Sequence, residues 1–139
     1  MIGRKVTGKK CIVAVDDSSI VLKTLEKMLG ETYEYHAFTK GMRALKYLKE
    51  NAAPDLIILD IDMEEIDGYE MLEMIRKKEE LEQVPVIFLT SNNDKQHVMK
   101  AISGGANDYA VKPVDEESFM GKVRKLLQED KKKLSWDDV

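Results

Sequence analysis

The sequence predicts an α/β domain with a mostly parallel sheet, because short apolar runs alternate with segments of helical periodicity. Three of these runs are rich in β-branched side chains and end abruptly at polar residues, at positions 11–15, 56–59 and 86–89. Their length and composition are typical of strands that are buried on both faces. With 139 residues, the chain has the length of one ordinary domain.

The first half of the chain contains two predicted strand–helix units. The first strand spans residues 11–15, and Ser18 or Ser19 caps the helix that follows it. A weaker strand spans residues 33–38. The next helix spans residues 41–50, and its spacing predicts three side chains that face inward: Met42, Leu45 and Leu48.

The second half continues the same alternation. The predicted strands are residues 56–59, 86–89 and 109–111. The predicted helices are residues 69–78, residues 98–102 and a final helix that Asp115 caps. We assign residues 9–130 to a single domain. Residues 131–139 form a polar tail that is either the end of the protein or the start of a linker.

The composition disfavours nucleic-acid-binding, secreted and membrane proteins as classes. The net charge of −4 disfavours direct binding of nucleic acid. The single cysteine, Cys11, cannot form an internal disulfide, which suits a reducing compartment. No apolar stretch approaches the ~20 residues that span a bilayer, and the basic first ten residues lead into too short an apolar run for a signal peptide. We therefore expect a cytoplasmic protein without membrane association.

Two further residue types have ordinary interpretations. The eight methionines are interpreted mostly as core-filling side chains on helix faces rather than as a binding surface. The two histidines, His36 and His97, have no cysteine or histidine near them in sequence, which disfavours a zinc site.

Polar side chains follow the predicted strands at the points where the strands end. In an open parallel sheet, ligands bind beyond the carboxyl ends of the strands, so we expect these side chains to converge. They are Asp16 and Asp17 after the first strand, Asp60 and Asp62 after the third, Thr90 after the fourth and Lys112 after the fifth.

This set of residue types indicates phosphoryl chemistry that depends on Mg²⁺. Carboxylates that lie close together repel one another, and Mg²⁺ relieves the repulsion while keeping coordination positions for phosphate oxygens. An ammonium and a hydroxyl bind the remaining oxygens. A carboxylate in this setting can also act as the nucleophile and become an aspartyl phosphate. A single carboxylate at a strand end is often only a helix cap, so the inference depends on convergence.

With this set of residues, the chain resembles the receiver domains of response regulators in two-component signalling, and is similar to the chemotaxis response regulator. Four motifs carry the resemblance, in order and at matching spacing: Val15-Asp16-Asp17-Ser18, Leu59-Asp60-Ile61-Asp62-Met63 with Asp67-Gly68, Leu89-Thr90-Ser91, and Tyr109-Ala110-Val111-Lys112-Pro113. The resemblance implies a flavodoxin-like (βα)5 fold, with five parallel strands in the order 2-1-3-4-5 and helices on both faces.

The resemblance also implies roles for these residues. Asp60 is the implied phosphoacceptor, and Thr90 and Lys112 the implied partners of the phosphoryl oxygens. The implied metal site for Mg²⁺ contains Asp17 and Asp60, with Asp16 acting through water and the backbone carbonyl of Asp62. Tyr109 is the implied switch aromatic. The Lys112–Pro113 peptide is expected to be cis.

The implied partners are a histidine kinase or a histidine phosphotransfer protein upstream, and a target protein or output domain downstream. Asn107, Asp108, Tyr109 and Arg124 match positions that pair in homodimers through the last two helices, so a homodimer is possible. The implied protein is a signalling switch that catalyses only its own phosphorylation and dephosphorylation. Glu64 stands where the family usually has proline and, like Asp62, adds negative charge near the metal site.

Two alternatives remain open. The first is a small Mg²⁺-dependent phosphohydrolase with Asp60 as its nucleophile, since Asp60-Ile61-Asp62 resembles the signature of haloacid-dehalogenase-type phosphatases. In that family, however, the second acidic cluster follows the nucleophile, whereas Asp16 and Asp17 precede it here. The second is a receiver-like scaffold that is never phosphorylated, which the complete set of acidic, Thr and Lys residues disfavours.

Overall fold

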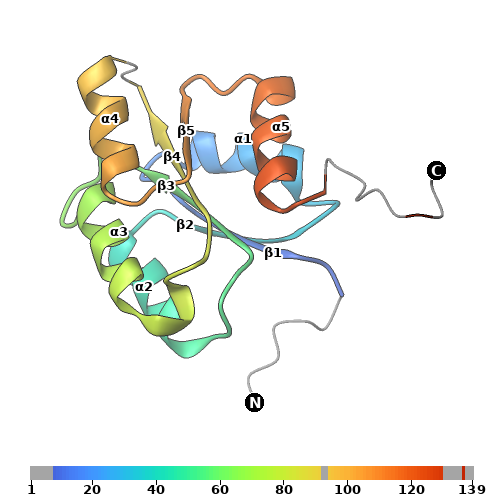
Figure 1. Cartoon of the computed structure of the whole chain (residues 1–139), viewed down its shortest axis with the longest axis horizontal. Helices are drawn as coiled ribbons and strands as arrows, with labels where there is room; N and C mark the ends of the chain where they lie inside the picture. Colours follow the sequence, from blue (N-terminus) through green and yellow to red (C-terminus); the bar gives the residue numbers. More distant parts are fainter. Residues whose placement is uncertain (1–7, 92–93, 130–135, 137–139) are drawn as a thin grey trace.

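A computed structural model describes residues 8–91, 94–129 and 136 of the chain. One sheet contains all the strands of this described part, and helices cover both of its faces (Figure 1). The strands are β1 (Cys11–Val15), β2 (Glu34–Phe38), β3 (Leu56–Asp60), β4 (Val86–Thr90) and β5 (Asp108–Val111). The helices are α1 (Ser19–Leu29), α2 (Gly41–Glu50), α3 (Gly68–Lys77), the short 3₁₀ helix η1 (Glu79–Leu81), α4 (Lys95–Ser103) and α5 (Glu116–Leu126).

The sheet has the strand order β2-β1-β3-β4-β5, and every pair of neighbouring strands is parallel. The predicted fold class and strand order are therefore confirmed. The order places β1 beside β3 at the centre, so the residues that end these two strands lie next to each other. It also leaves β2 and β5 as the edge strands of the sheet.

The sheet separates two apolar cores because side chains alternate between its faces along each strand. Val13 and Val15 of β1 pack into the core under α2, α3 and α4, whereas Ile12 and Ala14 pack into the core under α1 and α5. Figure 1 shows these two helical layers on opposite sides of the sheet. A strand buried on both faces has no position that faces solvent, which explains the continuous apolar runs in the sequence.

Short polar side chains fix the starts of most helices. Ser18 caps α1 and accepts a hydrogen bond from the Val21 N–H, as predicted, and Asp115 caps α5 in the same way. Asp67 forms a reciprocal capping box with Glu70, so α3 begins one residue earlier than the sequence predicted. The side chain of Asp94 caps α4, which therefore begins at Lys95 rather than at residue 98.

The inward face of α2 differs from the prediction at one position. Met42 was predicted to face inward, but it is 54% exposed, whereas Ala44 is fully buried and Leu48 nearly so. Ala44 and Leu48 are four residues apart and share one helix face, which turns Met42 outward. Met74 and Met99 are also about half exposed, at 50% and 59%, so several methionines are surface side chains and not core fillers.

Within the described residues, none of the helices combines the length and the apolar character that crossing a bilayer requires.

One close approach between α3 and the end of β3 generates a test of the fold. A methyl group added at Gly68 would lie 2.5 Å from the carbonyl oxygen of Asp60 and 2.8 Å from the Cα of Ile61, both backbone atoms. We therefore expect Gly68→Ala to lower the free energy of unfolding by about 1–3 kcal/mol, measured by urea denaturation.

Gly121, in the middle of α5, is the matched control, because a methyl group there meets no atom within 4 Å. Gly121→Ala should raise the free energy of unfolding by about 0.5–1 kcal/mol through helix propensity alone. Equal effects of the two substitutions would contradict the packing that we describe at Gly68.

Candidate functional site

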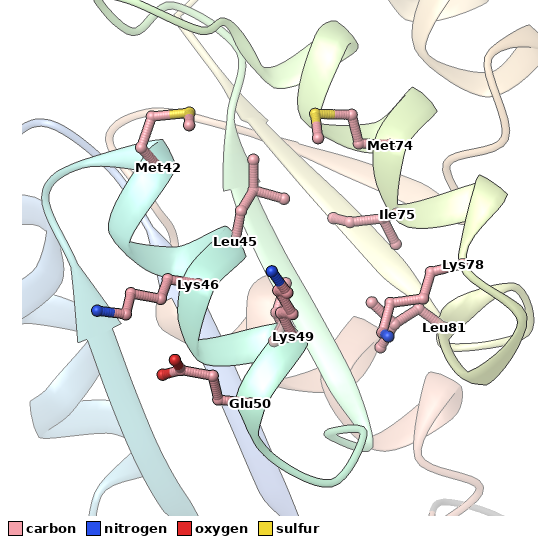
Figure 2. Close-up of a pocket in the computed structure, with 10 residues that line it drawn as sticks. Met42, Leu45, Lys46, Lys49, Glu50, Met74, Ile75, Lys78 and Leu81 are labelled. Carbon is pink, nitrogen blue, oxygen red and sulfur yellow. The ribbon is translucent and has the colours of Figure 1, made fainter.

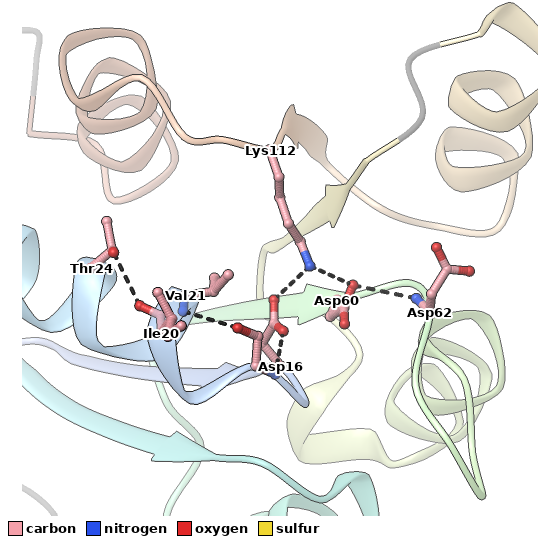
Figure 3. Close-up of polar contacts among 8 residues, drawn as sticks. Asp16, Ile20, Val21, Thr24, Asp60, Asp62 and Lys112 are labelled. Atoms are coloured by element: carbon pink, nitrogen blue, oxygen red, sulfur yellow. Dashed lines mark hydrogen bonds and ion pairs between the residues drawn. The ribbon is translucent and has the colours of Figure 1, made fainter.

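The carboxyl ends of the central strands bring two carboxylates and one ammonium into contact. The Nζ of Lys112 lies 2.9 Å from the Oδ2 of Asp16 and 3.0 Å from the Oδ1 of Asp60. Figure 3 shows the lysine side chain reaching down from the segment after β5 and ending between the two carboxylates. The sequence-predicted convergence of these residues is therefore observed.

Backbone hydrogen bonds hold each of the two carboxylates. The Oδ1 of Asp16 accepts a hydrogen bond of 2.9 Å from the Ser18 N–H, and the Asp16 N–H donates to the Phe38 carbonyl at 3.1 Å. Asp60 is the last residue of β3, and its Oδ1 accepts a further bond of 3.3 Å from the Asp62 N–H. The chain therefore fixes both carboxylates at the points where β1 and β3 end.

Burial and mutual repulsion shape the electrostatics of these groups. Asp16 is 0% exposed and Asp60 is 3% exposed. Burial, followed by the charge of Asp16, raises the pKa of Asp60 to about 6, although Lys112 acts in the opposite direction. Burial also opposes the charge of Lys112, but its contacts with Asp16 and Asp60 outweigh this effect and raise the pKa of the ammonium.

The same carboxylates can hold a divalent cation. Asp16, Asp17 and Asp60 each offer one oxygen, and these oxygens lie within 4.8 Å of one another. Within the described part of the chain, Asp16 Oδ2 is buried and accepts no hydrogen bond, and only the ion pair with Lys112 balances it. Asp17 is exposed, so solvent reaches the group. An all-oxygen donor set with one under-satisfied buried oxygen fits Mg²⁺.

The other predicted residues lie around this centre. Thr90 ends β4, where it is 2% exposed, and its carbonyl accepts a hydrogen bond of 2.8 Å from the Lys112 N–H. Tyr109 is half-buried in β5, with Lys122 Nζ at 4.8 Å from its ring centroid. The carboxylate of Asp62 is exposed and points away from Asp60, so only the backbone of Asp62 contacts the site (Figure 3). The Lys112–Pro113 peptide is cis, as expected.

Two further features of the structure were not predicted. A mainly apolar groove of about 570 Å³ lies between α2 and α3, where Met42, Leu45 and Met74 line it beside several lysines (Figure 2). The second feature is a group formed by Cys11, Glu34 and His36. No sequence spacing indicates either feature, because each depends on how two elements that are apart in the chain pack together.

The chain matches the response regulator receiver domain family over residues 12–124. It is 41% identical to the two-component response regulator ARR12 of Arabidopsis thaliana over 111 residues, which are 78% of this chain and 18% of that protein. The likeness to the rice regulator ORR24 is 43% over the same length and covers 17% of that protein. The chain therefore spans less than a fifth of the length of these curated relatives.

Solved structures of receiver domains have the same fold. A response regulator from Chloroflexus aurantiacus superposes with a TM-score of 0.81 at 30% identity, covering 86% of this chain and 98% of the other. The receiver domain of the sensor histidine kinase PA1611 from Pseudomonas aeruginosa superposes with a TM-score of 0.78 at 25% identity, over the same shares of the two chains. That structure holds a magnesium ion in its active-site cleft.

The raised pKa of Asp60 generates a pH-dependent prediction for the protein without metal. A carboxyl group whose pKa is higher in the folded than in the unfolded chain favours folding at low pH, and this contribution is lost as the pH rises through about 6. In EDTA at pH 7.5, we expect Asp60→Asn to raise the free energy of unfolding by about 1–3 kcal/mol.

At pH 4 the same substitution should have a much smaller effect, because Asp60 is then protonated in the folded protein. Urea denaturation of the parent and Asp60→Asn at the two pH values measures the difference. An increase that is equal at both pH values, or a loss of stability at pH 7.5, would contradict the electrostatics described above.

Proposed function

Since this chain belongs to the response regulator receiver domain family, we propose that Asp60 is the residue that accepts the phosphoryl group. Receiver domains of two-component response regulators are signalling switches that accept phosphoryl groups from histidine kinases. The observation that carries the assignment is the position of Asp60, a buried carboxylate at the end of a central strand that Lys112 joins to Asp16.

The transfer follows from the chemistry of these side chains. An Oδ of ionised Asp60 attacks the phosphorus of a phosphohistidine, the new O–P bond forms, and the P–N bond breaks. The imidazole leaves with the electron pair of that bond and takes a proton from solvent. Lys112 carries a positive charge at the position where phosphoryl oxygens arrive, and its raised pKa keeps it charged. Bound by Asp16, Asp17 and Asp60, Mg²⁺ would supply positive charge that offsets the carboxylates.

Thr90 and Tyr109 are the proposed switch pair. The Thr90 hydroxyl would bind a phosphoryl oxygen and move toward Asp60, which opens space for the ring of Tyr109. In this structure Lys122 holds the ring through a cation–π contact, and Lys122 Nζ also bonds the Tyr109 carbonyl and, at 3.4 Å, Asp108. Two alternative packings of one aromatic ring convert a local charge into a different surface.

We further propose that the domain comprises residues 9–130 and that the protein acts in the cytoplasm. Its partners are a histidine kinase or a histidine phosphotransfer protein, and a target protein or output domain. We expect no direct contact with nucleic acid. In a homodimer through the last two helices, Asp108 would pair with Arg124 of the second copy. Its hydrogen bond with Lys122 would then either break or persist beside the new ion pair.

A phosphohydrolase that uses the same nucleophile is the alternative, and the family match favours the receiver. The two functions differ in turnover. A receiver modifies only itself and then loses its own phosphoryl group, whereas a phosphohydrolase turns over an external phosphomonoester many times. We propose that this chain is not an enzyme in the second sense.

Phosphorylation by a small donor tests the assignment of Asp60. With acetyl phosphate and Mg²⁺, we expect the intact mass to increase by one phosphate, and with EDTA we expect no increase. Asp60→Asn should not be labelled. Asp62→Asn is the matched control, because it removes a neighbouring carboxylate that points away from the site, and it should be labelled like the parent. Labelling of Asp60→Asn would reject the assignment.

The proposed switch is tested by nuclear magnetic resonance with beryllofluoride, a mimic of the phosphoryl group. We expect shifts of Tyr109 and of residues in α4 and α5 as well as of the loop after Asp60. In Thr90→Ala, the loop should still shift while Tyr109 should not. Shifts that stay within the Asp60 loop of the parent protein would disprove the switch, although not phosphorylation itself.

A further inference from the structure

A second group of metal-ligating side chains lies on the sheet between β1 and β2. The parallel register pairs Cys11 with Glu34 and Val13 with His36. Because side chains alternate along a strand, Cys11, Glu34 and His36 project from the same face of the sheet. A thiol sulfur, a carboxylate oxygen and an imidazole nitrogen from these residues lie within 4.8 Å of one another.

The three side chains are held in place before any ligand binds. The Nε2 of His36 lies 2.8 Å from Glu34 Oε2, and the ring of His36 packs against Tyr47 of α2 with their centroids 5.0 Å apart. Cys11 is 0% exposed, whereas the side chains of His36 and Glu34 are 33% and 18% exposed. The thiol therefore forms the closed end of the group, and the histidine and the glutamate form the end that solvent reaches.

The donor types indicate which ion would bind. Thiolate sulfur and imidazole nitrogen are ligands for Zn²⁺ and similar transition-metal ions, whereas Mg²⁺ prefers oxygen. Zn²⁺ bonds of ~2.0–2.3 Å set tetrahedral ligand atoms about 3.3–3.8 Å apart. The Nε2 of His36 and the Oε2 of Glu34 are 2.8 Å apart and would separate slightly around an ion, and all three donor atoms already lie within 4.8 Å of one another. This group thus differs in ligand chemistry from the all-oxygen group at Asp16, Asp17 and Asp60.

We propose that Cys11, Glu34 and His36 form a second metal site, which binds Zn²⁺ or a similar ion and is independent of the phosphorylation site. On binding, the thiol loses its proton to solvent, and the ion replaces the direct contact between His36 and Glu34. A water molecule provides the fourth ligand, as in other zinc sites with three protein ligands.

The position of the site gives the ion a structural effect. In the described sheet, β2 is an edge strand that pairs only with β1. An ion held by Cys11 on β1 and by Glu34 and His36 on β2 ties the edge strand to the centre of the sheet. Because the unfolded chain does not hold these three residues together, ion binding raises the thermal stability of the folded state.

Cobalt spectroscopy of the full chain tests the proposal. Under reducing conditions and with saturating Mg²⁺ to fill the carboxylate site, titration with Co²⁺ should produce a thiolate-to-cobalt charge-transfer band at one ion per chain. Cys11 is the only cysteine in the sequence, so the band identifies its sulfur. Added Zn²⁺ should abolish the band and raise the melting temperature.

Variants of the partly exposed ligands separate the site from adventitious binding to a thiol. Loss of an outer-shell partner weakens metal binding about 10–100-fold. His36→Gln and Glu34→Gln each remove a direct ligand and should weaken Co²⁺ binding by more than that. They should also remove the stabilisation by Zn²⁺. His97→Gln is the matched control, because it removes the other histidine of the chain and should bind like the parent. Absence of the band, or binding that is unchanged in His36→Gln and Glu34→Gln, would overturn the proposal.

Discussion

The ion pairs of Lys112 with Asp16 and Asp60 are the constraint on which the functional end of the sheet depends. Two carboxylates that are almost fully buried lie at the ends of neighbouring strands, and the ammonium lies 2.9 Å and 3.0 Å from them. Loss of Lys112 would leave two buried carboxylates that repel each other without a cation, at a cost of about 3–5 kcal/mol. Loss of Asp60 would leave Lys112 paired with Asp16. Burial, followed by the charge of Asp16, raises the pKa of Asp60, so Lys112 offsets these two effects only in part.

Lys112 offsets the negative charge of the carboxylates only in part, and this connects stability to function. A site that is already neutral would bind a cation, or a phosphoryl group together with its metal ion, only weakly. Here the buried Asp16 Oδ2 lacks a hydrogen bond within the described residues, and Asp17 adds a third carboxylate at the solvent side. The folded chain therefore keeps a local excess of negative charge, which favours the binding of Mg²⁺. Natural proteins commonly accept such a stability cost where function requires it.

Much of the fold could be predicted because the apolar runs, the helical periodicity and the polar residues at strand ends all agree with one architecture. The runs at β1, β3 and β4 are apolar on both faces, and the polar residues after them mark the carboxyl ends at which ligands bind in parallel sheets. Only the resemblance to a known family gave the strand order. The ends of the helices were less accurate, since a cap such as Asp94 moves a helix start by several residues without changing the apolar pattern.

The features that sequence could not predict are those that depend on contacts between distant segments. The outward position of Met42 follows from the rotation of α2 against the sheet, which Ala44 and Leu48 set through packing. The group of Cys11, Glu34 and His36 follows from the register between β1 and β2. The exposed carboxylate of Asp62 follows from the backbone path after β3. In each case the sequence gives the residue type, but it does not tell which way the side chain points in the folded protein.

Direct identification of the phosphorylated side chain is the sharpest test of Asp60 as the phosphoacceptor. Borohydride reduces an aspartyl phosphate to homoserine, which marks the acceptor permanently in the chain. After reaction of the protein with a phosphoramidate donor in Mg²⁺ and reduction with borohydride, peptide sequencing should find homoserine at position 60 and intact aspartate at positions 16, 17 and 62. Homoserine at any of those other positions, or at none of the four, would contradict the assignment of Asp60 as the acceptor.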